Sequence, residues 1–137
     1  MKIEYRTPAG SGSYSVLADE SVATLAAAIS GFQPVVSKSP MVEAGYGAAV
    51  PVTLDLGNAN YRISFTVERV HASPDAALLF VQAEPLKFAG NVDLKITQGA
   101  QVTLLLGGAL TELTPEPHSD QSTKIRYAFA GGQYTTP

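Results

Sequence analysis

Two stretches of the sequence hold residues that could do chemistry, because each carries one of the two histidines. His71 ends a run of alternating apolar residues, with the carboxylates of Glu68 and Asp75 close in sequence. A histidine beside a carboxylate could act as a general base near neutral pH. Since no nucleophile is in view, we interpret His71 as a structural residue whose ring bonds a backbone carbonyl or faces solvent.

The second histidine lies in the stretch EPHSD, where Glu116, His118 and Asp120 occupy alternate positions. In an extended loop these side chains would share one side and could offer oxygen and nitrogen ligands to a metal ion. The stretch has neither a helical pair of histidines nor a calcium-loop pattern. A solvated loop is therefore the favoured interpretation, and we predict no metal site.

Other candidate sites have less support. The acidic pairs Asp19 with Glu20 and Glu112 with Glu116 would serve a hydrolase only if they converged across a cleft, which spacing along the chain does not show. The glycine-containing stretches SGSYS and AGYGA lack phosphate-binding patterns, and no G-x-S-x-G sequence is present. We therefore predict a non-enzymatic protein with no catalytic residue, no cofactor and no metal ligand.

Four tyrosines suggest a binding function. Tyr46, Tyr61, Tyr127 and Tyr134 could stack on sugar rings along one face of a β-sandwich. Tyr61 and Tyr127 lie in stretches whose same face carries isoleucine and phenylalanine, so core packing is the favoured interpretation. A β-sandwich module that recognises carbohydrate or a host-surface protein is the alternative function.

The composition favours protein partners. The chain has 137 residues, the size of one domain, with 45% hydrophobic residues and only 15% charged ones. This charged fraction lies below the roughly 25% that is usual in soluble domains, so much of the surface is apolar or neutral. A net charge of −3 without a basic run predicts no nucleic-acid partner. Cysteine is absent, which excludes disulfides and thiolate metal sites.

No membrane segment or leader is expected. The first ten residues carry charges without an apolar stretch behind them, unlike a secretory signal. The longest apolar window, residues 22–29, is much shorter than the roughly 20 residues that cross a bilayer. We therefore expect synthesis in the cytoplasm and no membrane partner.

Alternating apolar and polar residues predict several strands. The clearest is residues 61–67, and residues 52–56 precede it across a turn, which predicts a first hairpin. Further strands are predicted at residues 2–6 as a short charged edge strand, at 91–97 and 101–106 as a second hairpin, and at 124–130.

One helix is predicted between the two hairpins, over about residues 74–84. Ser73 is a good N-cap, Pro74 suits the first helical position, and Asp75 favours the positive end of the helix dipole. Pro85 is expected to stop the helix. The apolar arc is wider than a surface helix needs, so the helix is deeply packed or covered by another subunit. Residues 21–29 predict a second short helix, with a strand weakened by alanines as the alternative.

These elements predict a mainly β fold, an antiparallel β-sandwich or partly open barrel with one helix. We expect a single domain over residues 1–137, with residues 52–134 as the sandwich core and residues 1–51 as an arm or added layer. Residues 37–51 and 114–120 are expected to be long loops.

The stretches VERVHASPDAALLFVQAEP, AGNVDLKIT and RYAFAGGQY mark the order of elements over residues 52–134. This order resembles that of small virion proteins of tailed bacteriophages, in the tail-tip, distal-tail and minor-tail group. The resemblance implies a structural subunit of a phage tail, made in the host cytoplasm, that forms a homo-oligomeric ring and contacts adjacent tail proteins. The interfaces are expected at residues 37–51 and 114–120, since long loops in compact domains usually have a function.

Overall fold

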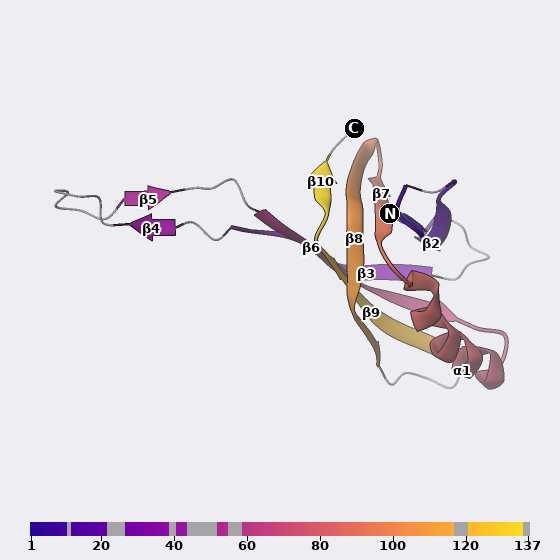
Figure 1. Cartoon of the computed structure of the whole chain (residues 1–137). Coiled ribbons are helices and arrows are strands. Elements are labelled where there is room, and N and C mark those ends of the chain that lie inside the picture. Colours follow the sequence, from indigo (N-terminus) through magenta and orange to yellow (C-terminus); the bar gives the residue numbers. More distant parts are fainter. Residues whose placement is uncertain are drawn as a thin grey trace.

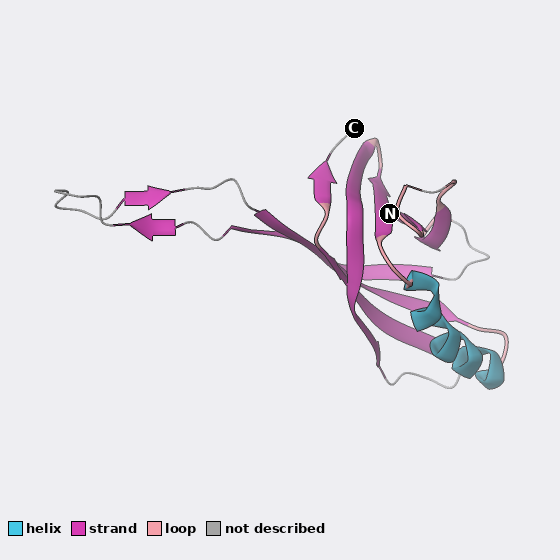
Figure 2. Ribbon diagram, in the orientation of Figure 1, coloured by secondary structure: helices cyan, strands magenta, loops and turns pink. Residues whose placement is uncertain are grey.

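The computed structural model describes residues 1–10, 12–21, 27–38, 41–43, 52–54, 59–116 and 121–135. It is mainly β, as the alternation predicted (Figures 1 and 2). The strands are β1 Lys2–Arg6, β2 Ser15–Asp19, β3 Ala27–Lys38, β4 Met41–Glu43, β5 Val52–Leu54, β6 Ala59–Val70, β7 Val92–Gln98, β8 Gln101–Glu116, β9 Ser122–Ala130 and β10 Gln133–Thr135. The helix α1 spans Pro74–Ala83, and a 3-10 helix, η2, follows at Glu84–Phe88.

The main sheet is antiparallel and open. Its strand order is β2-β1-β7-β8-β9-β6-β3, and β10 also pairs with β8. The long β8 belongs to both halves of this sheet, because its residues 101–108 pair with β7 and its residues 109–116 pair with β9. We call β2, β1, β7, β10 and the first half of β8 the first layer, and the second half of β8 with β9, β6 and β3 the second layer. This architecture confirms the predicted antiparallel sandwich or partly open barrel.

Glycines allow the chain to pass from one layer to the other. Gly107 has a φ of +69°, a left-handed conformation that favours glycine, and it lies where β8 leaves β7 for β9. A side chain at Gly132, between β9 and β10, would overlap the backbone of Leu106. The connection between β9 and β10 therefore passes in close backbone contact with β8 at the boundary between the layers.

The core lies between the two layers. Fully buried side chains come from both, and Phe88 of η2 packs edge-on against Tyr127 and Phe129 of β9. The largest fully buried apolar side chains are Ile3, Leu94 and Leu105 of the first layer and Ile63, Phe65, Ile125, Tyr127 and Phe129 of the second. Alternate residues of β6 and β9 are buried, which is the period of two that the sequence showed.

The predicted helix is confirmed. Ser73 caps α1, and its hydroxyl accepts a hydrogen bond from the backbone N–H of Ala76 at 3.2 Å. α1 ends before Pro85, but the chain continues directly into η2. Pro85 is tolerated there because it lies in the first turn of η2, where a backbone N–H has no partner within the helix. The two helices lie together at one end of the second layer (Figure 2).

The first predicted hairpin is wrong. β5 pairs with β4 in a separate two-stranded sheet, and β6 pairs with β3 and β9 instead. The reason is length: β6 has 12 residues and finds a partner of 12 residues in β3, whereas β5 has three. β4 and β5 lie beyond the ends of β3 and β6, away from the main sheet (Figure 1). The second hairpin, β7 with β8, is confirmed.

The N-terminal strands enter the main sheet. β1 pairs with both β2 and β7, so it is an inner strand, and the prediction of an edge strand is wrong. Residues 27–29, part of the predicted second helix, begin β3, because their ladder with β6 outweighs the helix propensity of alanine. Residues 22–26 lie outside the described residues, as does most of the predicted loop 37–51. The division at residue 51 stays a prediction.

Candidate functional site

His71 joins three elements at a corner. Its Nε2 lies 2.9 Å from the hydroxyl of Thr123 in β9, and its ring lies 5.0 Å from that of Phe80 in α1. Burial, and then the positive charge of Arg69, lower the pKa of the imidazole. The ring partner of His71 is thus a hydroxyl and not the backbone carbonyl that the sequence suggested, and its structural role stays a prediction. Its sequence neighbour Asp75 is in the first turn of α1 and faces solvent.

The other acidic candidates are separated from one another. Glu116 forms an ion pair with Lys124, with the two charged atoms 3.7 Å apart, while His118 and Asp120 lie outside the described residues. Glu112 pairs with Arg62 at 3.6 Å. The part of the chain that the structure describes contains no cluster of three histidine, aspartate or glutamate side chains that could hold a metal ion.

Asp19 and Glu20 also have separate partners. Asp19 accepts hydrogen bonds from the backbone and hydroxyl of Ser21, at 3.0 and 2.6 Å. These bonds lower the pKa of the Asp19 carboxyl. Glu20 lies 3.5 Å from the amino group of Met1. The pair therefore stabilises the end of β2 and does not converge on a cleft.

Of the candidate tyrosines that the structure describes, one lies in the core and two stack on each other. Tyr127 is fully buried in the core, as the favoured interpretation predicted. Tyr61 and Tyr134 are half-buried and stack on each other, with ring centroids 5.5 Å apart and planes 9° apart. Each of these two rings thus covers one face of the other. Tyr46 lies outside the described residues.

A buried polar cluster attaches the helices to the second layer. The hydroxyl of Tyr127 donates to Glu84 Oε1 at 2.7 Å and accepts from Arg69 at 3.1 Å. Arg69 also donates to the backbone oxygen of Leu17 at 2.8 Å. Burial raises the pKa of the Tyr127 hydroxyl, so it remains a donor. Glu84 Oε2 accepts no well-aligned hydrogen bond among the described residues, but the ammonium of Lys87 lies 2.9 Å away and neutralises it.

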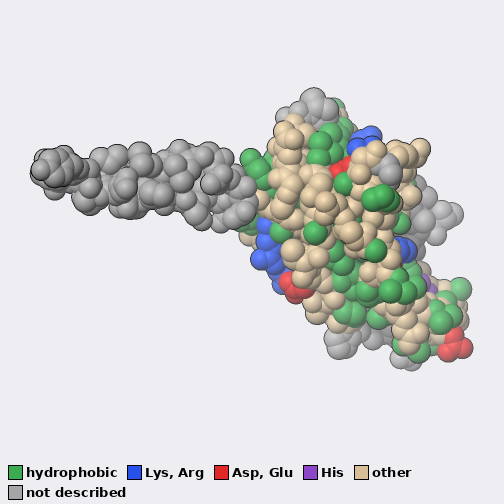
Figure 3. Space-filling view, viewed as in Figure 1, with side chains coloured by type: hydrophobic (Ala, Val, Ile, Leu, Met, Phe, Trp, Pro, Cys, Tyr) green, Lys and Arg blue, Asp and Glu red, His purple; other side chains and the backbone are tan. Residues whose placement is uncertain are grey.

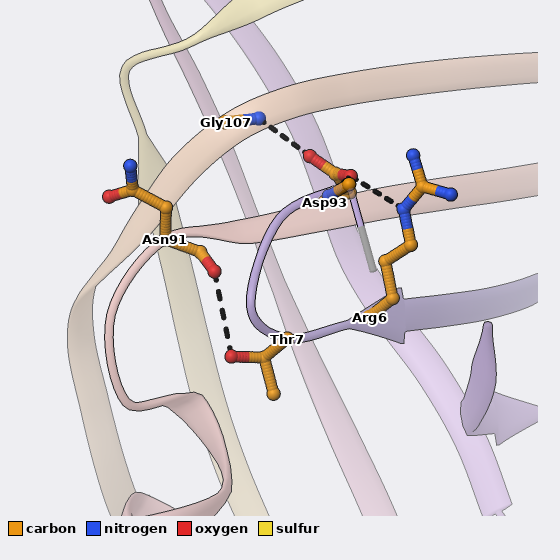
Figure 4. A network of polar contacts seen from close by, with 6 residues as sticks. Arg6, Thr7, Asn91, Asp93 and Gly107 are labelled. Atoms are coloured by element: carbon orange, nitrogen blue, oxygen red, sulfur yellow. Dashed lines mark hydrogen bonds and ion pairs between the residues drawn. The ribbon is translucent and has the colours of Figure 1, made fainter. Parts of the chain in front are cut away.

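A second buried carboxylate, Asp93, holds the boundary between the layers (Figure 4). It accepts from Arg6 Nε at 2.6 Å and from the backbone N–H groups of Gly10 and Gly107, each at 2.7 Å. Burial by itself would raise the pKa of Asp93, but these three donors outweigh it and the pKa is lowered. The ionised carboxylate thus fixes the bend of β8. The sequence showed Asp93 only as a polar position in a strand and contained no signal for this role.

Two strand edges of the second layer have no partner among the described strands. β3 ends the strand order, so only its edge toward β6 is paired. Residues 109–116 of β8 pair with β9 on one side, while β7 stops pairing at Gly108 on the other. These two edges, which we call the β3 edge and the β8 edge, lie on opposite sides of the same layer. Unpaired N–H and C=O groups of this kind can form a ladder with another chain.

The helices expose a large apolar surface. Leu78 is 59% exposed, Leu79 64% and Leu86 80%. Hydrophobic side chains gather over this end of the molecule in Figure 3. A pocket of about 220 Å³ lies between Ala77, Leu78 and Val81 of α1, Pro115 and Glu116 of β8, and the first residues of β9. No helix among the described residues is long and apolar enough to cross a bilayer.

Known proteins share this fold with little sequence identity. No family model matches the sequence, and no curated protein matches it. A chain of the phage p2 baseplate, in its activated conformation with Sr, matches with a TM-score of 0.57 and 15% identity over 93% of this chain. A chain from the tail of an empty gene transfer agent particle of C6 symmetry matches with a TM-score of 0.56 and 12% identity over 99%.

The two matches differ in how much of the known protein they span. This chain covers 43% of the baseplate protein but 94% of the gene transfer agent tail protein. It therefore spans less than half of the former and nearly the whole of the latter. The fold is that of phage baseplate and gene transfer agent tail proteins, which confirms the resemblance seen in the sequence.

Proposed function

We propose that this protein is a structural subunit of a phage tail or tail-tip, and that it works by forming a ring with copies of itself. The observation that carries the proposal is the pair of unpaired edges on opposite sides of the second layer. Such a subunit presents a different surface to each neighbour, and contacts of this kind close into a ring when the rotation allows.

The strand directions are compatible with edge-to-edge pairing. Neighbouring strands of the second layer are antiparallel, so β3 and β8 at its two edges run in opposite directions. A β3 edge laid against the β8 edge of the next copy would therefore continue the antiparallel alternation. We propose six copies in the ring, on the strength of the C6 symmetry of the gene transfer agent tail whose subunit shares this fold.

Adjacent tail proteins are the proposed further partners. β4 and β5 lie beyond the second layer (Figure 1). β4 falls within residues 37–51, which the sequence predicted as an interface, and β5 follows directly after them. We propose that this two-stranded sheet contacts the neighbouring ring or tail protein. The second predicted interface, residues 114–120, begins on the β8 edge with residues 114–116.

The proposed role requires no catalysis. Arg69, His71 and Glu84 are each bonded to structural partners, and the fold is shared with tail and baseplate proteins. We propose the virion tail as the location. Carbohydrate or host-surface binding, the alternative function, has no support from Tyr61 and Tyr134, whose rings stack on each other.

Electron microscopy of the purified chain at high concentration, with light scattering after size exclusion, tests the proposal. We expect rings or stacked rings of six copies. A protein that stays monomeric at all concentrations would overturn the proposed function.

A further inference from the structure

The apolar pocket beside α1 borders the β8 edge. Pro115 and Glu116 line it, and both belong to the half of β8 whose second side has no described partner. We call it the helix pocket. Its opposite wall is α1, where Leu78 is 59% exposed although it faces apolar neighbours. A half-open apolar space beside an unpaired strand is suited to a side chain brought by an added strand.

The residue pairing across the second layer shows which residues of an added strand would lie beside the helix pocket. Pro115 pairs with Ile125, Ile125 with Val67, and Val67 with Ile29. Ile125 and Val67 are buried in the core, so this row of side chains points to the core side of the layer. Pro115 and Ile29 are the two ends of one row, on the β8 edge and the β3 edge.

The β3 edge offers apolar side chains on that same side. Ile29 and Phe32 pack against the core of their own chain and are only partly buried, which leaves part of each side chain for a further contact. A copy that pairs its β3 edge with the β8 edge of the next would bring Ile29 to the level of Pro115. A shift of the added strand along the β8 edge by about three residues would bring Phe32 to that level in place of Ile29.

We propose that the helix pocket receives β3 of the adjacent copy, with Ile29 or Phe32 entering it against Leu78. This inference rests on the ring proposed above and adds the side-chain contact that fixes the register of the strands across the interface. An unpaired edge alone permits sliding by two residues, because every second residue faces the same way. A filled pocket favours one register over the others, and so fixes the angle between adjacent copies.

Cysteine cross-linking tests the contact directly, because the chain contains no cysteine. Leu78→Cys combined with Ile29→Cys, or with Phe32→Cys, should give a ladder of disulfide-linked oligomers from assembled rings under oxidation. Leu79→Cys in the same combinations is the matched control. Leu79 is similarly exposed, at 64%, but does not line the pocket, so it should give no ladder.

A charge placed in the pocket provides a second test. Leu78→Asp should lower the fraction of protein in rings at least about tenfold, since it would bury a second carboxylate in a pocket whose one lysine, Lys124, is already paired with Glu116. Leu79→Asp should lower it less than about twofold. Circular dichroism should show both variants folded. If the parent forms rings while Leu78→Asp assembles equally well and neither pair cross-links, the pocket inference is overturned and the ring stands. If the parent forms no rings, the proposed function fails.

Discussion

Two buried carboxylates hold different parts of this molecule, and their surroundings differ. Asp93, at the bend of β8, accepts two hydrogen bonds from backbone N–H groups and one from Arg6. Glu84, the first residue of η2, is held by the side chains of Tyr127 and Lys87. Backbone donors are fixed by the strands and turns that carry them, whereas a side chain can change its rotamer.

The difference separates the rigid part of the subunit from the adjustable one. A carboxylate held by backbone groups cannot move without moving β8, so the angle between the two layers is fixed. The helices are attached through longer side chains, and they carry the exposed apolar surface next to the β8 edge. We therefore expect perturbation at Asp93 to affect the whole fold and perturbation at the helices to have smaller, local effects.

The largest effect is expected from Asp93→Ala. It leaves the backbone N–H groups of Gly10 and Gly107, which donate in part-buried hydrogen bonds, and the partly buried Arg6 without their acceptor. The free energy of unfolding should fall by about 3 kcal/mol. Urea denaturation followed by circular dichroism measures it. Asp75→Ala, at an exposed acid, is the control, and an equal loss in both variants would refute the role assigned to Asp93.

Removal of the Tyr127 hydroxyl comes next. Tyr127→Phe keeps the ring in the core but deprives Glu84 of its donor, so the free energy of unfolding should fall by about 2 kcal/mol. The same denaturation experiment applies. Tyr61→Phe, whose ring stacks on Tyr134 at the surface, should cost much less. A smaller loss for Tyr127→Phe than for Tyr61→Phe would contradict a helix attachment through Glu84.

The helix cap gives a smaller effect. Ser73→Ala removes the acceptor of the Ala76 N–H and should lower the free energy of unfolding by about 1 kcal/mol. Ser73→Asp restores an acceptor at the helix N-terminus and should recover most of this loss. If Ser73→Asp were as unstable as Ser73→Ala, the hydroxyl would not act as a cap.

The pH dependence of the Asp93 contribution is the finest test. The folded pKa of Asp93 is lowered from its ordinary value of 3.8, so the ionised form stabilises the fold above that value. This part of the stability is lost as the pH falls through the folded pKa. The stability gap between the parent and Asp93→Asn should therefore be full at pH 6 and narrow below about pH 4. A gap that is constant with pH would contradict an ionised Asp93.

Local patterns in the sequence predicted the elements well. The cap at Ser73, the alternation through β6 and the hairpin of β7 with β8 depend on neighbours within a few residues, and all are present. Pairing between strands that are distant in sequence was harder to predict. The turn-like residues before Tyr61 suggested a partner for β6 immediately upstream, whereas its partner β3 comes from the other side of β4 and β5.

The sequence predicted the kind of site, a surface for protein neighbours, but not the edges and pocket that form it. The low charge, the wide apolar arc of the helix and the resemblance to tail proteins indicated a subunit with protein neighbours. The two unpaired edges follow from the strand order, and the helix pocket from the packing of α1 beside Pro115. Neither can be derived from spacing along the chain, since each joins segments that are far apart in sequence.

By itself, the sequence determined the mainly β character, the capped helix and the absence of cysteine chemistry, because propensity, capping and composition are properties of single residues and near neighbours. Tertiary structure alone decided three features: the acceptor role of Asp93, the hydrogen bond from Tyr127 to the buried Glu84, and the position of the β3 and β8 edges. Burial and strand pairing depend on which distant segments meet, and only the folded chain brings them together.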